Sequence, residues 1–193
     1  NRFCSSGLQA IAYGAERIML GAAEVAIAGG TESMSMVPMG GNKISPNPAL
    51  IESYPDVYLS TGLVAENHAR EASISREEQD RFAVESQGKA GKAIAAGAFK
   101  AEIVPVQVDA KTLIAADEHV RPDTTMEQLS KLPPVFKDGG TVHAGNSSGI
   151  TDGAAATLLV AESLLAKAKL EPLAFLEDYD SVGVDPRIMG IGP

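Results

Sequence analysis

A helical repeat that leads into a short, wholly apolar run constrains the fold of this chain more than any other feature. Apolar or small residues recur three or four positions apart from Leu8 to Ala22, which places them on one face of a helix of about four turns. Residues 25–28 are all valine, alanine or isoleucine and are followed by two glycines. Such a run is typical of a strand that is buried on both faces. A helix that leads into a buried strand predicts an α/β fold.

Later segments repeat this alternation around a long interruption. Residues 31–60 lose all periodicity and are rich in proline and glycine, which predicts a loop. Helices are expected from about 61 to 71 and from Ser75, where Ser75 and Glu78 fit a capping box and Gly97 a C-terminal cap. The inward face of the second helix is expected to hold Phe82, Ala83, Ser86, Ala90, Ala93 and Ile94. The shorter elements expected are an edge strand at 103–108, helices at 125–131 and 162–169, a buried strand at 154–160 and a long strand at 173–184.

Charge and cysteine content exclude several classes of function. Sixteen basic and 25 acidic residues give a net charge of −9, which argues against binding to nucleic acid or to a membrane surface. The single cysteine excludes an internal disulfide and a cysteine-based zinc site, and it suits a reducing, cytoplasmic location. His68, His119 and His143 share no metal-ligand spacing, so no metal is expected and each histidine is read as structural or solvated.

Cys4 is the leading candidate for chemistry. It stands just before the first helix, where free backbone N–H groups and the helix dipole can stabilise a thiolate, the nucleophilic form of the side chain. Ser5, Ser6 and Gly7 are small and leave room for a substrate. The alternative is a buried structural cysteine.

Two other features could bind a ligand. Residues 143–149 form a polar, glycine-rich loop that could offer N–H groups and hydroxyls to amides or phosphates, although such residues are also what ordinary turns use. Arg121 could bind a phosphate or pair with the acidic residues just before it.

Taken together, these segments resemble the thiolase family. The segments that carry the resemblance span nearly the whole chain and are Asn1-Arg2-Phe3-Cys4-Ser5-Ser6-Gly7, Ala28-Gly29-Gly30-Thr31-Glu32-Ser33-Met34-Ser35, Ser75-Arg76-Glu77-Glu78-Gln79-Asp80, Gly140-Thr141-Val142-His143-Ala144-Gly145-Asn146-Ser147-Ser148-Gly149 and Pro186-Arg187-Ile188-Met189-Gly190-Ile191-Gly192-Pro193. The resemblance implies a partial thiolase fold, a layered α/β/α arrangement with an inserted loop domain. It places residues 1–34 and 151–172 in the N-terminal domain, 35–150 in the inserted domain that binds coenzyme A (CoA), and 173–193 at the start of the C-terminal domain. Most of the second half, with the family's base histidine and second cysteine, is expected to lie outside this chain, which is not expected to turn over alone.

The resemblance also implies a reaction of fatty-acid β-oxidation. Cys4 would attack a 3-oxoacyl-CoA, release acetyl-CoA and pass the acyl group to a second CoA, which is a co-substrate and not a tightly bound cofactor. The positions that match family contacts to CoA or the acyl chain are Arg121, Phe136, Ala144, Ser148 and Met189. The intact protein is expected to be a homodimer or homotetramer whose partners are CoA and acyl-CoA, with no nucleic acid or membrane.

Some residues depart from the family pattern, and other functions stay open. Ser60-Thr61-Gly62 stands where biosynthetic acetoacetyl-CoA thiolases carry His-Met-Gly, which favours a degradative enzyme. His143 replaces a usual threonine, and Ser147 a usual alanine. The alternatives are a biosynthetic thiolase, a condensing enzyme of fatty-acid or polyketide synthesis, and a silent CoA- or lipid-binding relative in which Cys4 is structural.

Overall fold

A computed structural model describes all 193 residues and divides them into two units. The first unit contains Asn1–Ile44 and Ile150–Val182, and the second contains Ser45–Gly149 and Gly183–Pro193. Each unit is therefore built from two segments that are distant in the sequence. None of the helices is both long and apolar enough to cross a membrane.

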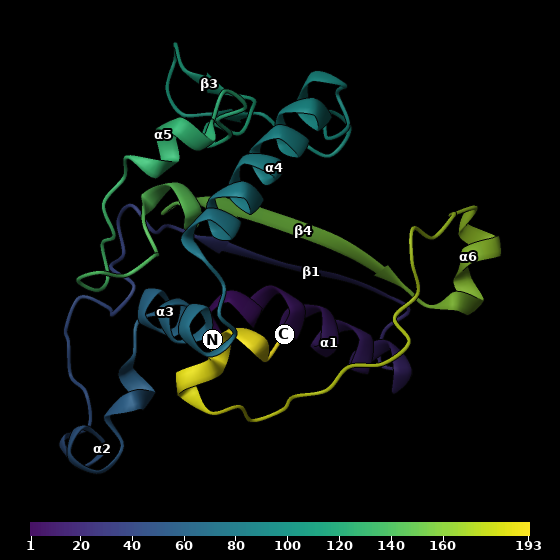
Figure 1. Ribbon diagram of the computed structural model, residues 1–193. Coiled ribbons are helices and arrows are strands. Elements are labelled where there is room, and N and C mark those ends of the chain that lie inside the picture. Colours follow the sequence, from purple (N-terminus) through teal and green to yellow (C-terminus); the bar gives the residue numbers. More distant parts are fainter. The chain divides into compact units, whose positions relative to one another are not determined.

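The first unit is a two-stranded antiparallel sheet with a helix against it. The 3₁₀ helix η1 (Phe3–Ser5) leads into α1 (Ser6–Met19), and β1 (Val25–Glu32) pairs with β4 (Gly153–Val160) from Val25↔Val160 to Glu32↔Gly153. Figure 1 shows the two strands side by side and α1 alongside them, with α6 (Glu162–Ala168) after β4. The helix expected after Cys4, the strands expected at 25–28 and 154–160 and the helix expected at 162–169 are confirmed.

Small residues allow α1 to approach the sheet closely. A Cβ at Gly14 would lie 2.7 Å from a terminal carbon of Leu159 and 3.6 Å from the Cβ of Ala26. Ala12 and Ala28 are the buried apolar residues of this unit. A side chain at position 14 would require the Leu159 side chain to move.

The expectation that both strands are buried on two faces is wrong for this structure. Ile27 of β1 is 78% exposed and Leu158 of β4 is 54% exposed. The physical reason is that the sheet has only these two strands and α1 packs against one of its faces. The expected strand at 173–184 is also wrong, because these residues pair with no other strand, and Leu173 is fully exposed.

The second unit is mostly helical. Its main helices are α3 (Thr61–Glu71) and α4 (Arg76–Ala95), both as expected. Its smaller elements are α2 (Pro48–Ser53), η2 (Pro55–Tyr58), β2 (Val106–Gln107), β3 (Leu113–Ile114), α5 (Met126–Ser130), η3 (Ala144–Asn146) and η4 (Pro186–Ile191). The stretch 31–60 is thus not all loop, since β1 runs into it, and the Asn47 side chain caps α2 at Pro48. The strand expected at 103–108 is reduced to two residues, which pair with β3.

The inward face of α4 differs from the expected one. Phe82 is 74% exposed and Ser86 is exposed, whereas Asp80 is buried. The reason is that α4 packs against α5 and η3 largely through hydrogen bonds of its polar side chains. The face of α4 predicted from its apolar repeat is therefore offset by about one residue from the face that is buried in the structure.

The capping box that begins α4 should contribute measurably to stability. The Ser75 hydroxyl accepts a hydrogen bond from the Glu78 backbone N–H (3.2 Å), and the Glu78 carboxylate accepts one from the Ser75 N–H (2.8 Å). We expect Ser75→Ala to lower the free energy of unfolding by about 1 kcal/mol in urea denaturation. Ser86→Ala, at an exposed position in the same helix, is the control and should cost nothing, since alanine favours helix. Equal effects of the two substitutions would contradict this role of Ser75.

Candidate active site

Cys4 is an exposed free thiol at the start of α1. The N-cap residue Ser5 makes no side-chain hydrogen bond to the helix, and the first turn of α1 holds no acidic residue. The positive end of the helix dipole is therefore not neutralised by the protein and favours a negative charge nearby. In this structure Cys4 is not the buried residue that the structural alternative describes.

The backbone before Cys4 is held in a strained conformation. Phe3 has a φ of 50°, in the left-handed region, which costs a residue with a side chain about 1–2 kcal/mol. Two short contacts hold it: the Phe3 N–H donates to Oδ1 of Asn1 (2.7 Å), and the Arg2 N–H donates to Oγ of Ser6 (2.9 Å). Strain that the surroundings maintain next to an exposed nucleophile is typical of a functional position.

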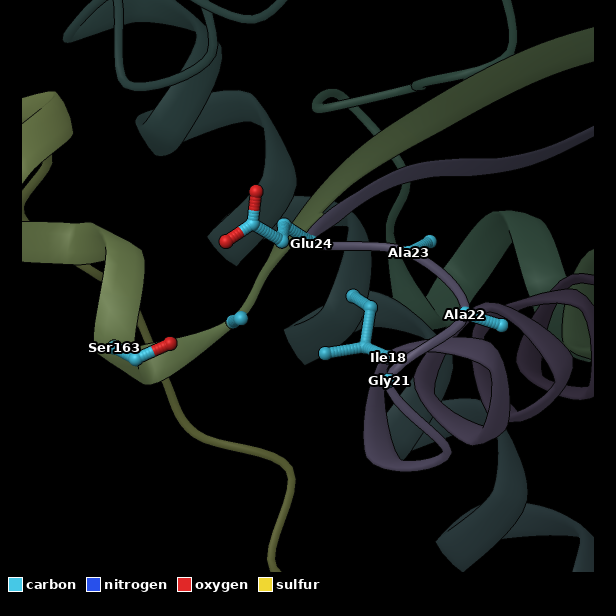
Figure 2. Close-up of a pocket in the computed structure, with 7 residues that line it drawn as sticks. Ile18, Gly21, Ala22, Ala23, Glu24 and Ser163 are labelled. Atoms are coloured by element: carbon cyan, nitrogen blue, oxygen red, sulfur yellow. The ribbon is translucent and has the colours of Figure 1, made fainter.

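Figure 2 shows a pocket in the first unit that is separate from Cys4. It lies at the far end of α1, and its lining residues are Ile18, Gly21, Ala22, Ala23, Glu24, Ala161 and Ser163. A helix of this length spans about 20 Å, so the pocket is far from Cys4. Its polar side chains, Glu24 and Ser163, form no hydrogen bond with each other, and they offer no nucleophile with a base beside it.

The five residues expected to contact CoA or the acyl chain all lie in the second unit, and Cys4 lies in the first. Arg121 is exposed, and its backbone N–H donates to Oε1 of Gln87 on α4 (2.8 Å). Its guanidinium takes part in none of the ion pairs of the structure, so the expected alternative of a surface ion pair is wrong. This cation is available to an anionic ligand.

Helix α3 organises two of the other positions. The ring of Phe136 lies against Gly62, in the space that a Cβ would fill, and Phe136 remains 40% exposed. Met189 is 47% exposed in η4. This segment is held to α3 by a hydrogen bond from the Asn67 amide to the Arg187 carbonyl (3.2 Å) and by an ion pair between Arg187 and Glu71 (2.9 Å). Phe136 and Met189 thus each present apolar surface to solvent from segments that rest on one helix.

Ala144 and Ser148 lie in and just after η3, and both are exposed. Gly149, next to Ser148, packs against the ring of His119, whose Nδ1 lies 2.7 Å from where a Cβ of Gly149 would be. His119 is two residues from Arg121. The structure therefore brings the loop of Arg121 and the segment of Ser148 together.

A buried polar network supports this segment, and most of it was not anticipated from the sequence. Oε1 of Glu66 on α3 accepts hydrogen bonds from the N–H groups of Thr141 (2.8 Å) and Val142 (2.7 Å). Asp80 on α4 accepts from Arg76 (2.8 Å) and lies 2.7 Å from Nε2 of His143. Asp80 is 2% exposed and His143 is fully buried. The prediction that His143 is a structural residue is confirmed. The only signal of this network in the sequence was the spacing of Arg76 and Asp80 by one helical turn.

The network also fixes the charge of Asp80. Burial alone would raise the pKa of this carboxyl, but hydrogen bonds from His143 and Arg76, with the positive charge of Arg76, outweigh it. The pKa of Asp80 therefore lies below its ordinary value of 3.8, and the group is a carboxylate at neutral pH.

Comparisons with known proteins agree on one family. Residues 1–163 match the model of the thiolase N-terminal domain. The chain is 50% identical to the 3-ketoacyl-CoA thiolase of Bacillus subtilis and 44% identical to the mitochondrial 3-ketoacyl-CoA thiolase of Homo sapiens, in each case over 100% of this chain and 52% of the relative. It spans about half the length of these relatives.

Solved structures show the same fold. The human mitochondrial 3-ketoacyl-CoA thiolase in complex with CoA matches with a TM-score of 0.84 at 44% identity, over 98% of this chain and 51% of that one. The dimeric peroxisomal thiolase of Saccharomyces cerevisiae matches with a TM-score of 0.87 at 38% identity, over 97% and 49%. The expected thiolase fold is confirmed.

Proposed function

The chain belongs to the thiolase family, and we propose that it supplies the nucleophile and part of the CoA site for thiolytic cleavage of 3-oxoacyl-CoA. The observation that carries the proposal is the placement of the single cysteine, which is exposed after a strained residue at the uncapped start of α1. The names of the relatives, 3-ketoacyl-CoA thiolase and acetyl-CoA acyltransferase, support the same reaction class.

The reaction would proceed in two acyl-transfer steps. In the first, the thiolate of Cys4 forms a bond to the 3-keto carbon, and the bond between C2 and C3 breaks. Its electron pair leaves with C2, which takes up a proton to give acetyl-CoA, and the shortened acyl group remains on Cys4 as a thioester. In the second, the thiolate of another CoA attacks this thioester and releases Cys4. The Cys4 backbone N–H would donate to the developing oxyanion.

We propose that the second unit contributes the contacts to CoA. The unpaired guanidinium of Arg121 would face the nucleotide phosphates, and the exposed ring of Phe136 would pack beside the cofactor. Ala144 and Ser148 would meet the pantetheine amides, and Met189 would border the acyl chain. Within this proposal, residues 35–150 form the inserted CoA-binding domain, 1–34 and 151–172 belong to the N-terminal domain, and 173–193 begin the C-terminal domain. CoA acts as a co-substrate that leaves at each turnover.

Assembly and location follow from the same proposal. We propose a homodimer or homotetramer, since the yeast peroxisomal thiolase is dimeric and apolar side chains such as Ile27 and Met19 are exposed here. A reducing location such as the cytoplasm is proposed because Cys4 must remain a thiol. The relatives include mitochondrial and peroxisomal proteins, and the chemistry would be the same there.

We propose the degradative direction, because Ser60-Thr61-Gly62 stands where biosynthetic enzymes of the family carry His-Met-Gly. Ser60 caps α3 by accepting a hydrogen bond from the Leu63 N–H (3.4 Å).

Trapping the acyl-enzyme tests the proposal. The chain, joined to the C-terminal remainder of the Bacillus subtilis relative, is mixed with a 3-oxoacyl-CoA, quenched within the first turnovers and digested for mass spectrometry. We expect an acyl group on Cys4 that added CoA removes. If CoA binds but no adduct forms, the protein is a silent CoA binder and the thiolase mechanism is rejected.

A further inference from the structure

The hydrogen bonds of His143 determine its protonation state. Its Nδ1 lies 3.0 Å from the backbone nitrogen of Gly145, whose N–H can only donate, so Nδ1 must be unprotonated. Its Nε2 lies 2.7 Å from Oδ1 of Asp80, a carboxylate that can only accept, so Nε2 must carry the proton. The side chain is a neutral imidazole with both nitrogens in use.

This ring joins α4 to η3. On one side Asp80 belongs to α4 and is held by Arg76, whose guanidinium also donates to the carbonyls of Leu129 and Leu132. On the other side the Gly145 N–H belongs to η3. The Asn146 amide adds a second link, because it donates to Asp80 (3.2 Å) while its oxygen accepts from the His143 N–H (2.8 Å).

We propose that His143 is a positioning residue of the CoA site, which fixes η3 to α4 and so sets the backbone at Ala144 and Ser148. The proposal rests on the proposed function, in which these two residues meet the pantetheine amides. Both are exposed and make no side-chain hydrogen bond that could hold them in place, so their positions depend on the buried residues between and beside them. A neutral ring suits this role, because a second proton would remove the acceptor for Gly145 and place an extra charge beside Arg76 in a fully buried position.

The charged and polar groups around this segment come from α3 and α4. Asp80 of α4 contacts the ring directly, and Arg76 contacts Asp80. Gln79 of α4 bonds to Thr141, and Glu66 of α3 holds the backbone of the preceding residues Thr141 and Val142. Asp80 is shared between Arg76, which contacts Oδ2, and the ring of His143, which contacts Oδ1.

The first test compares CoA binding by variants of the 193-residue chain in calorimetry. His143→Phe fills the same space without either hydrogen bond. His143→Asn keeps an acceptor near the Gly145 N–H but is too short to reach Asp80. We expect His143→Asn to weaken CoA binding about tenfold, the loss of one well-buried hydrogen bond, and His143→Phe, which loses both, to weaken it at least as much. Arg81→Gln, at an exposed position of α4, is the control and should leave binding unchanged. Folded variants that bind CoA within twofold of the unchanged chain would overturn the positioning role.

The second test uses the unchanged chain, so it tests the role of His143 even if the substituted chains do not fold. Nitrogen NMR of the unchanged chain should show His143 protonated on Nε2 alone, with slow hydrogen exchange at the Gly145 amide. Added CoA should slow exchange further across residues 144–148. A ring protonated on Nδ1, or a Gly145 amide that exchanges freely, overturns the inference. If the unchanged chain binds no CoA, the proposed CoA site itself is rejected. If it binds CoA but the ring is protonated on Nδ1, or the variants bind CoA as well as the unchanged chain does, only the role of His143 is rejected.

Discussion

Replacing Cys4 with serine should lower the rate of acyl transfer by about four orders of magnitude or more. A serine hydroxyl is almost entirely protonated at neutral pH and is a poor leaving group from the ester that it would form, so both proposed steps slow. The measurement is steady-state thiolysis of a 3-oxoacyl-CoA by the chain joined to the remainder of the Bacillus subtilis relative.

Two controls separate chemistry from folding in this experiment. Cys4 is exposed, so the serine variant should unfold within about 0.5 kcal/mol of the unchanged protein. Ser5→Ala alters the neighbouring residue, whose side chain makes no capping hydrogen bond, and should retain most of the activity. Thiolysis that persists within tenfold in the serine variant would remove Cys4 from the mechanism.

Replacing Asp80 with alanine should lower the free energy of unfolding by about 3–5 kcal/mol, because it leaves a half-buried arginine and a fully buried histidine without their acceptor. Arg76 is a quarter exposed and His143 is fully buried, so water cannot replace the lost carboxylate at the imidazole. Urea denaturation followed by the helical circular dichroism signal measures the change, since the longest helices lie in the second unit.

The same helix offers a matched control for Asp80. Glu77 and Arg81 form an ion pair with the same one-turn spacing and the same 2.8 Å separation, but both side chains are more than half exposed. Glu77→Ala should therefore cost no more than about 0.5 kcal/mol. A similar cost for both substitutions would show that burial does not strengthen the Asp80 pair.

The lowered pKa of Asp80 adds a pH dependence with a definite sign. Because the folded-state pKa lies below the ordinary value of 3.8, ionisation of Asp80 stabilises the fold fully above that pH. This contribution is lost as the pH falls through the lower folded-state pKa. The difference in unfolding free energy between the unchanged chain and Asp80→Ala should thus be constant near neutral pH and shrink below about pH 4.

Local patterns in the sequence were enough to predict most of the helices. The Ser75–Glu78 capping box and the helical repeat after Cys4 both describe contacts within a few residues, and both are present in the structure. The same local reasoning left Cys4 open between a nucleophile and a buried structural residue, and the structure shows it exposed. What these patterns could not show was which face of a helix meets another segment, and so Phe82 was wrongly placed in the core.

The buried network was missed because its partners come from segments that are far apart in the sequence. Glu66, Asp80 and His143 each look like an ordinary surface residue in their own segment. Only the packing of α3 and α4 against residues 141–146 gives them acceptors and donors. The strand expected at 173–184 failed for the converse reason, since a strand needs a partner that no local pattern supplies.

The interleaved order of the two units has a consequence for synthesis of the protein on the ribosome. Strand β1 emerges early, yet its partner β4 is separated from it by almost the whole of the second unit. During that interval β1 lacks the strand with which it pairs in the structure, and an unpaired strand edge is prone to pairing with other chains. The second unit likewise lacks η4 until residues 150–182 of the first unit have been synthesised. Folding of either unit during translation is therefore delayed by the other, and nascent chains of this kind should depend on chaperones that shield an open strand edge.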